Sequence, residues 1–111
     1  MTHTTFELTS ADGLKLFARG WLASQTKSKG VVYLVHGIGE HTGRYDHLGK
    51  ALSENGYHLI GIDLRGHGLS EGKRGHTPTF ENYFSDINLL MAESRSRFGS
   101  QLSNFLYGHS L

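Results

Sequence analysis

The sequence predicts an α/β fold in which an antiparallel hairpin is followed by a parallel sheet, built in the order strand, helix, strand, helix, strand. This fold is predicted by two kinds of segment that alternate along the chain. Short apolar runs without polar alternation are typical of strands buried on both faces, and longer amphipathic segments show helical periodicity. The apolar runs are 31–35, 59–64 and 105–107, and the amphipathic segments are 43–56 and 80–91. Buried strands that alternate with such helices form parallel sheets with right-handed crossovers.

The hairpin is predicted near the N-terminus. Two segments of alternating polarity, 6–10 and 14–22, flank Asp12-Gly13. An Asp-Gly dipeptide between two such segments favours a tight antiparallel turn. A polar surface loop is expected at 24–30, between the hairpin and the first apolar run.

Each amphipathic segment is expected to form a helix with one apolar face. The face of the first helix is formed by Tyr45, Leu48, Ala51 and Leu52. This helix is expected to end at Asn55-Gly56, a typical C-terminal stop. The apolar stripe of the second helix is formed by Phe80, Tyr83, Phe84, Ile87, Leu90 and Met91, and Pro78-Thr79 marks its expected start.

Composition excludes several classes of protein. The 111 residues carry a formal net charge of +1 and 19% of them are charged, so no nucleic-acid partner is indicated. Without cysteine, disulfides and thiolate metal sites are excluded. No apolar stretch reaches the roughly 20 residues of a membrane span, and the N-terminus lacks the features of a secretion signal. We therefore expect a soluble, cytoplasmic protein. Because His36, His41 and His47 lack a helical pair with carboxylate support, neither a metal nor a cofactor is expected.

The candidate functional residues follow the three apolar runs. His36-Gly37 comes after the first run, Asp63 closes the second, and Gly108-His109-Ser110 comes after the third. Parallel sheets bind ligands at the carboxyl ends of their strands, which is where all three motifs are expected. Gly-His-Ser is also the first part of the pattern G-x-S-x-G, in which a serine sits on a tight strand-to-helix turn. This placement makes Ser110 a candidate nucleophile.

Taken together, four motifs resemble the α/β-hydrolase superfamily and, within it, the monoacylglycerol lipase and lysophospholipase branch, which is also labelled serine aminopeptidase-like. The resemblance runs from about residue 6 to residue 111. The motifs are 36–41 with Arg44-Tyr45, then 63–70, then 74–76, and finally 108–111. The resemblance implies that residues 1–111 are the N-terminal portion of an α/β-hydrolase domain whose later strands, cap and remaining triad residues are absent. It also implies that the whole protein is a serine hydrolase that cleaves carboxylic esters of lipophilic substrates, monoacylglycerols or lysophospholipids, through an acyl-enzyme.

The resemblance also implies roles for individual residues. Ser110 is the implied nucleophile, and the backbone N–H groups of Ile38 and Leu111 are the implied donors of the oxyanion hole. The residues implied to support the loops are His36, Gly37, Gly39, Asp63, Arg65, Gly66, His67, Gly68 and Gly108. In the family order the triad acid follows the serine, so Asp63 is expected to brace a turn. Glu40, His41 and Arg44 are expected to tie the first loop to the first helix, and the side chain of His109 to point away from that of Ser110.

A second, non-enzymatic interpretation stays open. The chain could be a catalytically inactive truncated product that acts as a binding or assembly partner through an open sheet edge. As it stands, residues 105–107 would form an exposed apolar edge strand, so the isolated chain is expected to self-associate. Within the enzyme class, a peptidase or a dehalogenase-like relative also stays open. The expected partner is a small lipid ester, and transient contact with a membrane surface through the cap is left open.

Overall fold

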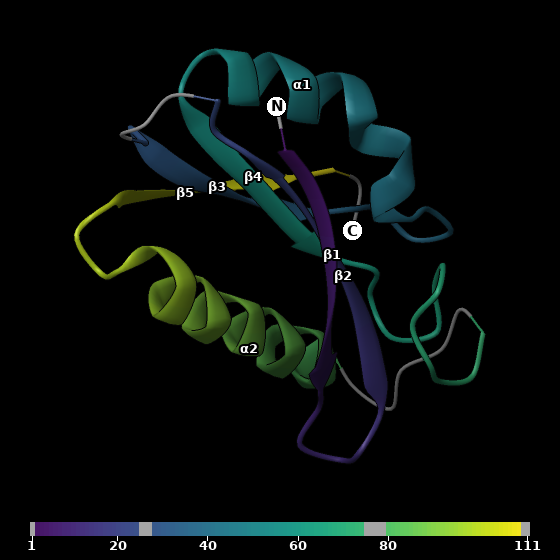
Figure 1. Ribbon diagram of the computed structural model, residues 1–111. Coiled ribbons are helices and arrows are strands. Elements are labelled where there is room, and N and C mark those ends of the chain that lie inside the picture. The colour runs from purple at the N-terminus through teal and green to yellow at the C-terminus, as the bar shows by residue number, and fades with distance from the viewer. Residues whose placement is uncertain (1, 25–27, 75–79, 110–111) are drawn as a thin grey trace.

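The computed structural model describes residues 2–24, 28–74 and 80–109 of the chain. It is an α/β structure in which helices lie on both faces of a twisted sheet (Figure 1). The elements, in chain order, are β1 (Thr2–Thr9), β2 (Lys15–Leu22), β3 (Gly30–Val35), the 3₁₀ turn η1 (Thr42–Tyr45), α1 (Asp46–Glu54), β4 (Tyr57–Ile62), α2 (Phe80–Phe98) and β5 (Ser103–Gly108).

The five strands form one sheet in the order β1-β2-β4-β3-β5. β1 pairs with β2, and β2 with β4, in antiparallel orientation, whereas β3 pairs in parallel with β4 and with β5. The predicted hairpin and the predicted parallel sheet are therefore both confirmed. β3 lies between its two parallel neighbours, and all six of its residues are buried.

Two apolar clusters hold the layers together, one on each face of the sheet. Along β3, Val31 and Tyr33 point toward the α2 layer, while Val32 and Leu34 point toward the α1 layer. In Figure 1, α1 covers one face of the sheet and α2 the other. A strand covered on both faces has no solvent-facing side, which explains why this run is apolar throughout.

The first helix differs from the prediction in one position of its apolar face. Tyr45, Leu48 and Leu52 pack on the α1-side cluster as predicted, but Ala51 is exposed. The helix ends at Glu54 with Asn55 as its C-cap, and Gly56 follows with φ +89°, as the stop signal predicts.

The second helix is longer than the predicted stripe, because it continues to Phe98. Of the stripe, Tyr83 and Leu90 are buried, whereas Phe80 and Phe84 are exposed. The expected helix start at Pro78-Thr79 lies outside the described residues. Within the described residues, we find no helix that combines the length and the hydropathy of a membrane-spanning segment.

β5 forms where predicted but is not a buried strand. All six of its residues are exposed, with Phe105 at 50%, Leu106 at 65% and Tyr107 at 42%. The reason is that, within the described part of the chain, β5 pairs on one side only, with β3. This agrees with the expectation of an apolar edge strand in the chain as it stands.

The packing of α1 on the sheet depends on a glycine. A methyl group at Gly49 would lie 2.3 Å from ring carbons of Trp21, whose Nε1 donates to Asp46 at 3.0 Å. We expect Gly49→Ala to lower the free energy of unfolding by about 1–3 kcal/mol, because overpacking forces the layers apart. Urea unfolding of wild type and variant measures this difference.

The control is Ala51→Gly, at an exposed position of the same helix. Helix propensity alone favours alanine by about 1 kcal/mol, so this variant reports the backbone contribution without the clash. If Gly49→Ala raises the free energy of unfolding by as much as Ala51→Gly lowers it, the space at Gly49 does not limit the packing.

Candidate active site

The predicted site residues gather where the parallel strands end, which we call the carboxyl edge of the sheet. Because β3, β4 and β5 run parallel, His36, Asp63 and His109 all follow the carboxyl ends of their strands. Val35 lies opposite Gly108, and the N–H of His109 donates to the carbonyl of Val35 at 3.0 Å, which extends the ladder beyond β5. Ser110 and Leu111 lie outside the described residues, so the structure shows the approach to the predicted nucleophile and not the nucleophile itself.

A tight turn follows β3. The N–H of Glu40 donates to the carbonyl of Gly37 at 3.1 Å, and Gly39 inside the turn has φ +81°. This left-handed conformation carries no penalty for glycine and is strained for other residues. The Gly37 N–H donates to the Glu40 carboxylate at 2.9 Å. The Ile38 N–H has no acceptor among the hydrogen bonds of the described residues.

The Glu40 carboxylate joins three parts of this edge. Its Oε1 atom accepts from the Gly37 N–H, from the Tyr45 hydroxyl at 2.8 Å and from Nδ1 of His109 at 3.1 Å. The Gly37 N–H and the Tyr45 hydroxyl lower the pKa of Glu40 to about 2. Burial, together with the Glu40 hydrogen bond, raises the pKa of Tyr45 to about 12.

The sequence predicted part of this arrangement. Glu40 ties the loop to the first helical turn as expected, and Arg44 lies 3.9 Å from its carboxylate. The contact between Glu40 and His109, 69 residues apart, was not predicted. The sequence does show that both residues follow predicted parallel strands. It does not show that these two strands are neighbours in space, as they are in the structure.

His36 is buried and neutral. Its Nε2 atom accepts from the Leu64 N–H at 2.8 Å, which leaves Nδ1 as the donor to the Gly37 carbonyl, also at 2.8 Å. Both ring nitrogens are therefore occupied, and burial lowers the pKa of the imidazole. These two hydrogen bonds join the segments that follow β3 and β4, and the loop-supporting role of His36 stays a prediction.

Asp63 is fully buried, and backbone and hydroxyl donors occupy its carboxylate. Oδ1 accepts from the N–H and the hydroxyl of Thr42 at 2.7 and 2.6 Å, and Oδ2 accepts from the Leu69 N–H at 3.0 Å. Gly68 adopts φ +50°, and a Cβ there would lie 2.3 Å from Oδ2. Asp63 thus links the 3₁₀ turn to the loop after β4.

The Arg65 guanidinium reaches further than the predicted turn. It donates to the Asp86 carboxylate at 2.8 and 2.9 Å and to the Asp12 carboxylate at 2.8 and 3.1 Å. These hydrogen bonds raise the pKa of Arg65 and lower the pKa of Asp12. Arg65 therefore connects the hairpin turn, the loop after β4 and helix α2.

His67 and Gly66 belong to the same loop. The His67 imidazole is buried, its Nδ1 lies 3.0 Å from the Arg65 carbonyl, and its Nε2 has no partner among the described residues. Gly66 has φ +75°, and its N–H donates to the Glu71 carbonyl at 2.9 Å. Within the described residues, no three histidine or acidic side chains are arranged to hold a metal ion.

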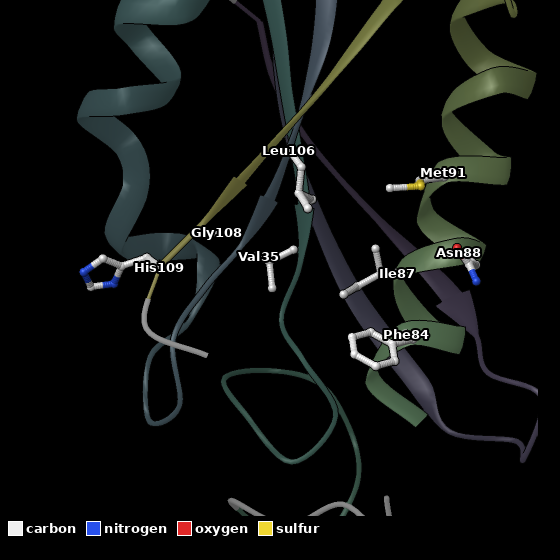
Figure 2. A pocket seen from close by; sticks show the side chains of 8 residues that line it. All are labelled: Val35, Phe84, Ile87, Asn88, Met91, Leu106, Gly108 and His109. Carbon is white, nitrogen blue, oxygen red and sulfur yellow. The ribbon is translucent and has the colours of Figure 1, made fainter. Parts of the chain in front are cut away.

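An apolar groove of about 360 Å³ runs from this edge between β5 and α2. We call it the α2-side groove; Figure 2 shows Leu106, Met91, Ile87 and Phe84 pointing into it. The imidazole of His109 turns to the opposite side, toward the α1 layer (Figure 2). The groove and the Glu40 contacts thus lie on different sides of the end of β5.

The Glu40 hydrogen bonds make the stability of the chain depend on pH. The pKa of this carboxyl falls from an ordinary 4.5 to about 2 on folding, so its contribution is complete above about pH 4.5 and is lost as the pH falls toward 2. The free energy of unfolding of the wild type should fall between near-neutral pH and about pH 3, and we expect this fall to be smaller in Glu40→Gln, which has no carboxyl to protonate there. Urea unfolding at both pH values measures it.

Asp12 and Asp46, whose pKa values are also lowered, remain in both proteins and cancel in the comparison. Glu93→Gln is the matched control, because that carboxylate pairs with Arg97 on the surface of α2. An unchanged pH dependence in Glu40→Gln would contradict the assignment.

Comparisons with known proteins show the family of this chain. A family model for the serine aminopeptidase family, S33, matches residues 26–111. Monoglyceride lipase from Rattus norvegicus is 36% identical over 104 residues, which cover 94% of this chain and 34% of the lipase. Monoacylglycerol lipase from Mycolicibacterium smegmatis is 30% identical over 110 residues, which cover 99% of this chain and 39% of that protein.

A comparison with solved structures finds proteins of the same kind. The crystal structure of a soluble variant of monoglyceride lipase from Saccharomyces cerevisiae, in complex with a substrate analogue, matches with a TM-score of 0.80 and 27% identity. The match covers 99% of this chain and 36% of that one. The chain thus spans between a third and two fifths of the length of these relatives. On these grounds it belongs to the serine aminopeptidase S33 family of α/β-hydrolases, in the monoglyceride lipase branch.

Proposed function

We propose that this chain is the N-terminal part of a serine hydrolase that cleaves carboxylic esters of lipophilic substrates. One observation carries the proposal: among the described residues the Ile38 N–H has no acceptor, and it lies in a turn held by Glu40, beside the strand that leads to Gly108-His109-Ser110. A backbone donor at this place is what an oxyanion hole requires. The family membership supports the same assignment.

In the proposed reaction, the Ser110 hydroxyl attacks the ester carbonyl carbon and transfers its proton to a general base. The carbonyl oxygen becomes an oxyanion that accepts from the N–H groups of Ile38 and Leu111. Collapse of this intermediate releases the alcohol, which takes the proton, and leaves the acyl group on Ser110. Water then hydrolyses the acyl-enzyme. The two donors stabilise charge that develops only in the transition state, and loss of one typically costs about 10²- to 10³-fold in kcat.

The substrate class rests on the relatives. Two of them are lipases named for monoglycerides or monoacylglycerols. We therefore propose a monoacylglycerol or a similar single-chain lipid ester, such as a lysophospholipid, as the substrate. Neither a metal nor a cofactor has a part in this mechanism.

The proposal includes the domain organisation. Residues 1–111 form an incomplete α/β-hydrolase domain, and the acid and base of the triad follow Ser110 in the family order. The DNA after the Leu111 codon tests this directly. An open frame that begins Gly-Gly and encodes an aspartate and a histidine well downstream supports the enzyme.

A second function has its own support in the exposed edge of β5. If a stop codon follows Leu111 and the product is abundant in cells, a catalytically inactive binding or assembly partner is favoured. The two functions differ in what β5 does: in the enzyme it carries the nucleophile inside a larger sheet, and in the partner it recruits another chain.

The oxyanion assignment is tested in the full-length hydrolase by two substitutions at one position. Ile38→Ala keeps the backbone donor, and the side chain is 51% exposed, so turnover should change little. Ile38→Pro deletes the donor and should lower kcat by about 10²-fold or more. Hydrolysis of a monoacylglycerol measures both. Circular dichroism must show that each variant is folded, and a folded Ile38→Pro enzyme with full kcat would refute the assignment.

The purified 111-residue chain is expected to be inactive. A serine hydroxyl is a weak nucleophile until a base takes its proton, and the proposed base follows Ser110 in the whole enzyme. Of the described histidines near these strand ends, His36 has both ring nitrogens occupied, His67 is buried, and His109 contacts Glu40. In this polypeptide, a carboxylate on Leu111 would also oppose the developing oxyanion.

Labelling by a fluorophosphonate probe and release of p-nitrophenol from a short-chain ester measure this, each against Ser110→Ala. Labelling or turnover that depends on Ser110 would show that these residues suffice for catalysis.

A further inference from the structure

Glu40 connects the turn after β3 with the end of β5. Its Oε1 atom accepts from the Gly37 N–H at 2.9 Å, from the Tyr45 hydroxyl at 2.8 Å and from Nδ1 of His109 at 3.1 Å. These donors belong to three segments, namely the turn after β3, the 3₁₀ turn η1 and the residue that follows β5. The first segment contains the proposed oxyanion donor, and the last directly precedes the proposed nucleophile.

The Glu40 carboxylate is ionised at neutral pH, because the Gly37 N–H and the Tyr45 and His109 side chains lower its pKa to about 2. An ionised carboxylate only accepts hydrogen bonds, so Nδ1 of His109 carries the proton between the two groups. Hydrogen bonds to a charged acceptor are shorter and stronger than neutral ones. Three of them on one oxygen atom therefore hold three segments at fixed distances from one another.

The Gly37 carbonyl oxygen is held from two sides. It accepts from the Glu40 N–H at 3.1 Å and from Nδ1 of His36 at 2.8 Å. The peptide bond that follows is planar and trans, so the Ile38 N–H points in the direction opposite to this carbonyl. Glu40 thus binds the Gly37 N–H with its side chain and the Gly37 carbonyl with its backbone. Both bonds determine the direction in which the Ile38 N–H points.

The residue before Ser110 is held by its backbone and by its side chain. The His109 N–H donates to the Val35 carbonyl at 3.0 Å, and the imidazole donates to Glu40. The Tyr45 ring lies edge-on to this imidazole, with 6.5 Å between the ring centroids. Figure 2 shows that the imidazole turns away from the α2-side groove. The end of β5 is therefore anchored to the same carboxylate that holds the turn after β3.

We propose that Glu40 is a positioning residue of the proposed hydrolase. It holds the Ile38 N–H at a fixed distance from the end of β5 and thereby keeps this donor aligned with Ser110. The inference rests on the proposed function, because it assigns Glu40 a part in that reaction without contact to the substrate. An oxyanion hole works only when its donors lie close to the place where negative charge develops. A displacement of about 1 Å can cost on the order of 10²-fold in rate.

A Glu40 with a purely structural role would behave differently. Its hydrogen bonds would then stabilise the loop equally with and without substrate, and its removal would lower the stability of the enzyme without a selective effect on the transition state. Positioning predicts a split between the two kinetic constants. Because the oxyanion develops only in the transition state, kcat falls while KM changes little.

The first experiment removes the carboxylate in the full-length hydrolase. We expect Glu40→Ala to lower kcat for a monoacylglycerol by about 10-fold to 100-fold, since the donor at Ile38 is displaced but not deleted. KM should change by less than about 3-fold. Glu93→Ala is the matched control, because this carboxylate pairs with Arg97 on the surface of α2, and it should leave both constants unchanged. Thermal melts followed by circular dichroism show whether each variant is folded.

The second experiment changes the donor, and it stays decisive if Glu40→Ala does not fold. His109→Leu removes the N–H that binds Glu40, whereas His109→Asn keeps an N–H donor near the position of Nδ1. We expect kcat to fall by about 10-fold in His109→Leu and by clearly less in His109→Asn. In the double variant Glu40→Ala/His109→Leu, the loss should not exceed that of Glu40→Ala alone, because both substitutions break the same connection.

The third experiment separates the oxyanion from substrate binding by means of two inhibitors. A trifluoromethyl ketone with a long alkyl chain forms a bond between its carbonyl carbon and the Ser110 oxygen. The carbonyl π electrons then pass to the oxygen, which becomes an oxyanion, and the serine proton passes to the general base. Glu40→Ala should weaken this inhibition by the same factor as it lowers kcat/KM. An ether analogue of monoacylglycerol forms no oxyanion and should bind both enzymes equally.

Failure of this inference differs from failure of the proposed function. A full-length wild type that cleaves no carboxylic ester overturns the proposed function and this inference with it. With an active wild type, three results would each overturn the inference alone. These are a folded Glu40→Ala enzyme with full kcat, equal weakening of the ketone and the ether inhibitor, and an equal loss of kcat in His109→Asn and His109→Leu.

Discussion

The parallel alignment of β3 with both β4 and β5 is the constraint on which the other features of this chain depend. It forces β3 to be apolar on both faces, because α1 covers one and α2 the other. It also brings the segments after these three strands to one edge, where His36, Asp63 and His109 lie. A change that shifted the register of β3 by one residue would exchange its two faces and separate the Val35–Gly108 pair that aligns the loops.

Buried ionic groups then hold the loops at this edge. Asp63 is satisfied by Thr42 and by the Leu69 N–H, while Arg65 is satisfied by Asp86 and Asp12. Buried charges are tolerated only when such partners are present, and removal of one partner leaves the other uncompensated. With these groups fully engaged, they have little capacity for acid–base chemistry. The chemistry proposed for this edge therefore falls to backbone donors and to Ser110, not to its buried acids.

Local sequence signals predicted the elements well, and long-range contacts poorly. Asp12-Gly13 and Asn55-Gly56 marked a turn and a helix end, because glycine-containing stops act within a few residues. Ala51 misled the prediction, since small apolar residues occur on either face of a short helix. The link between Glu40 and His109 depends on strand order, and the periodicity of one segment carries no information on which strand becomes its neighbour. The reach of Arg65 to Asp86 and Asp12 was missed for the same reason.

The two proposed functions make different demands on β5. β5 delivers Ser110 to the carboxyl edge, so the proposed chemistry requires that β5 be held firmly, whereas its outer side is open in this chain. A strand paired on one side frays more easily than one paired on both, and the His109 N–H bond to Val35 lies at its end. Whatever covers the outer side would also order the approach to Ser110, whether further strands of a larger sheet in the enzyme or another chain in the assembly partner. Both coverings would use the outer side of β5, so they would exclude each other.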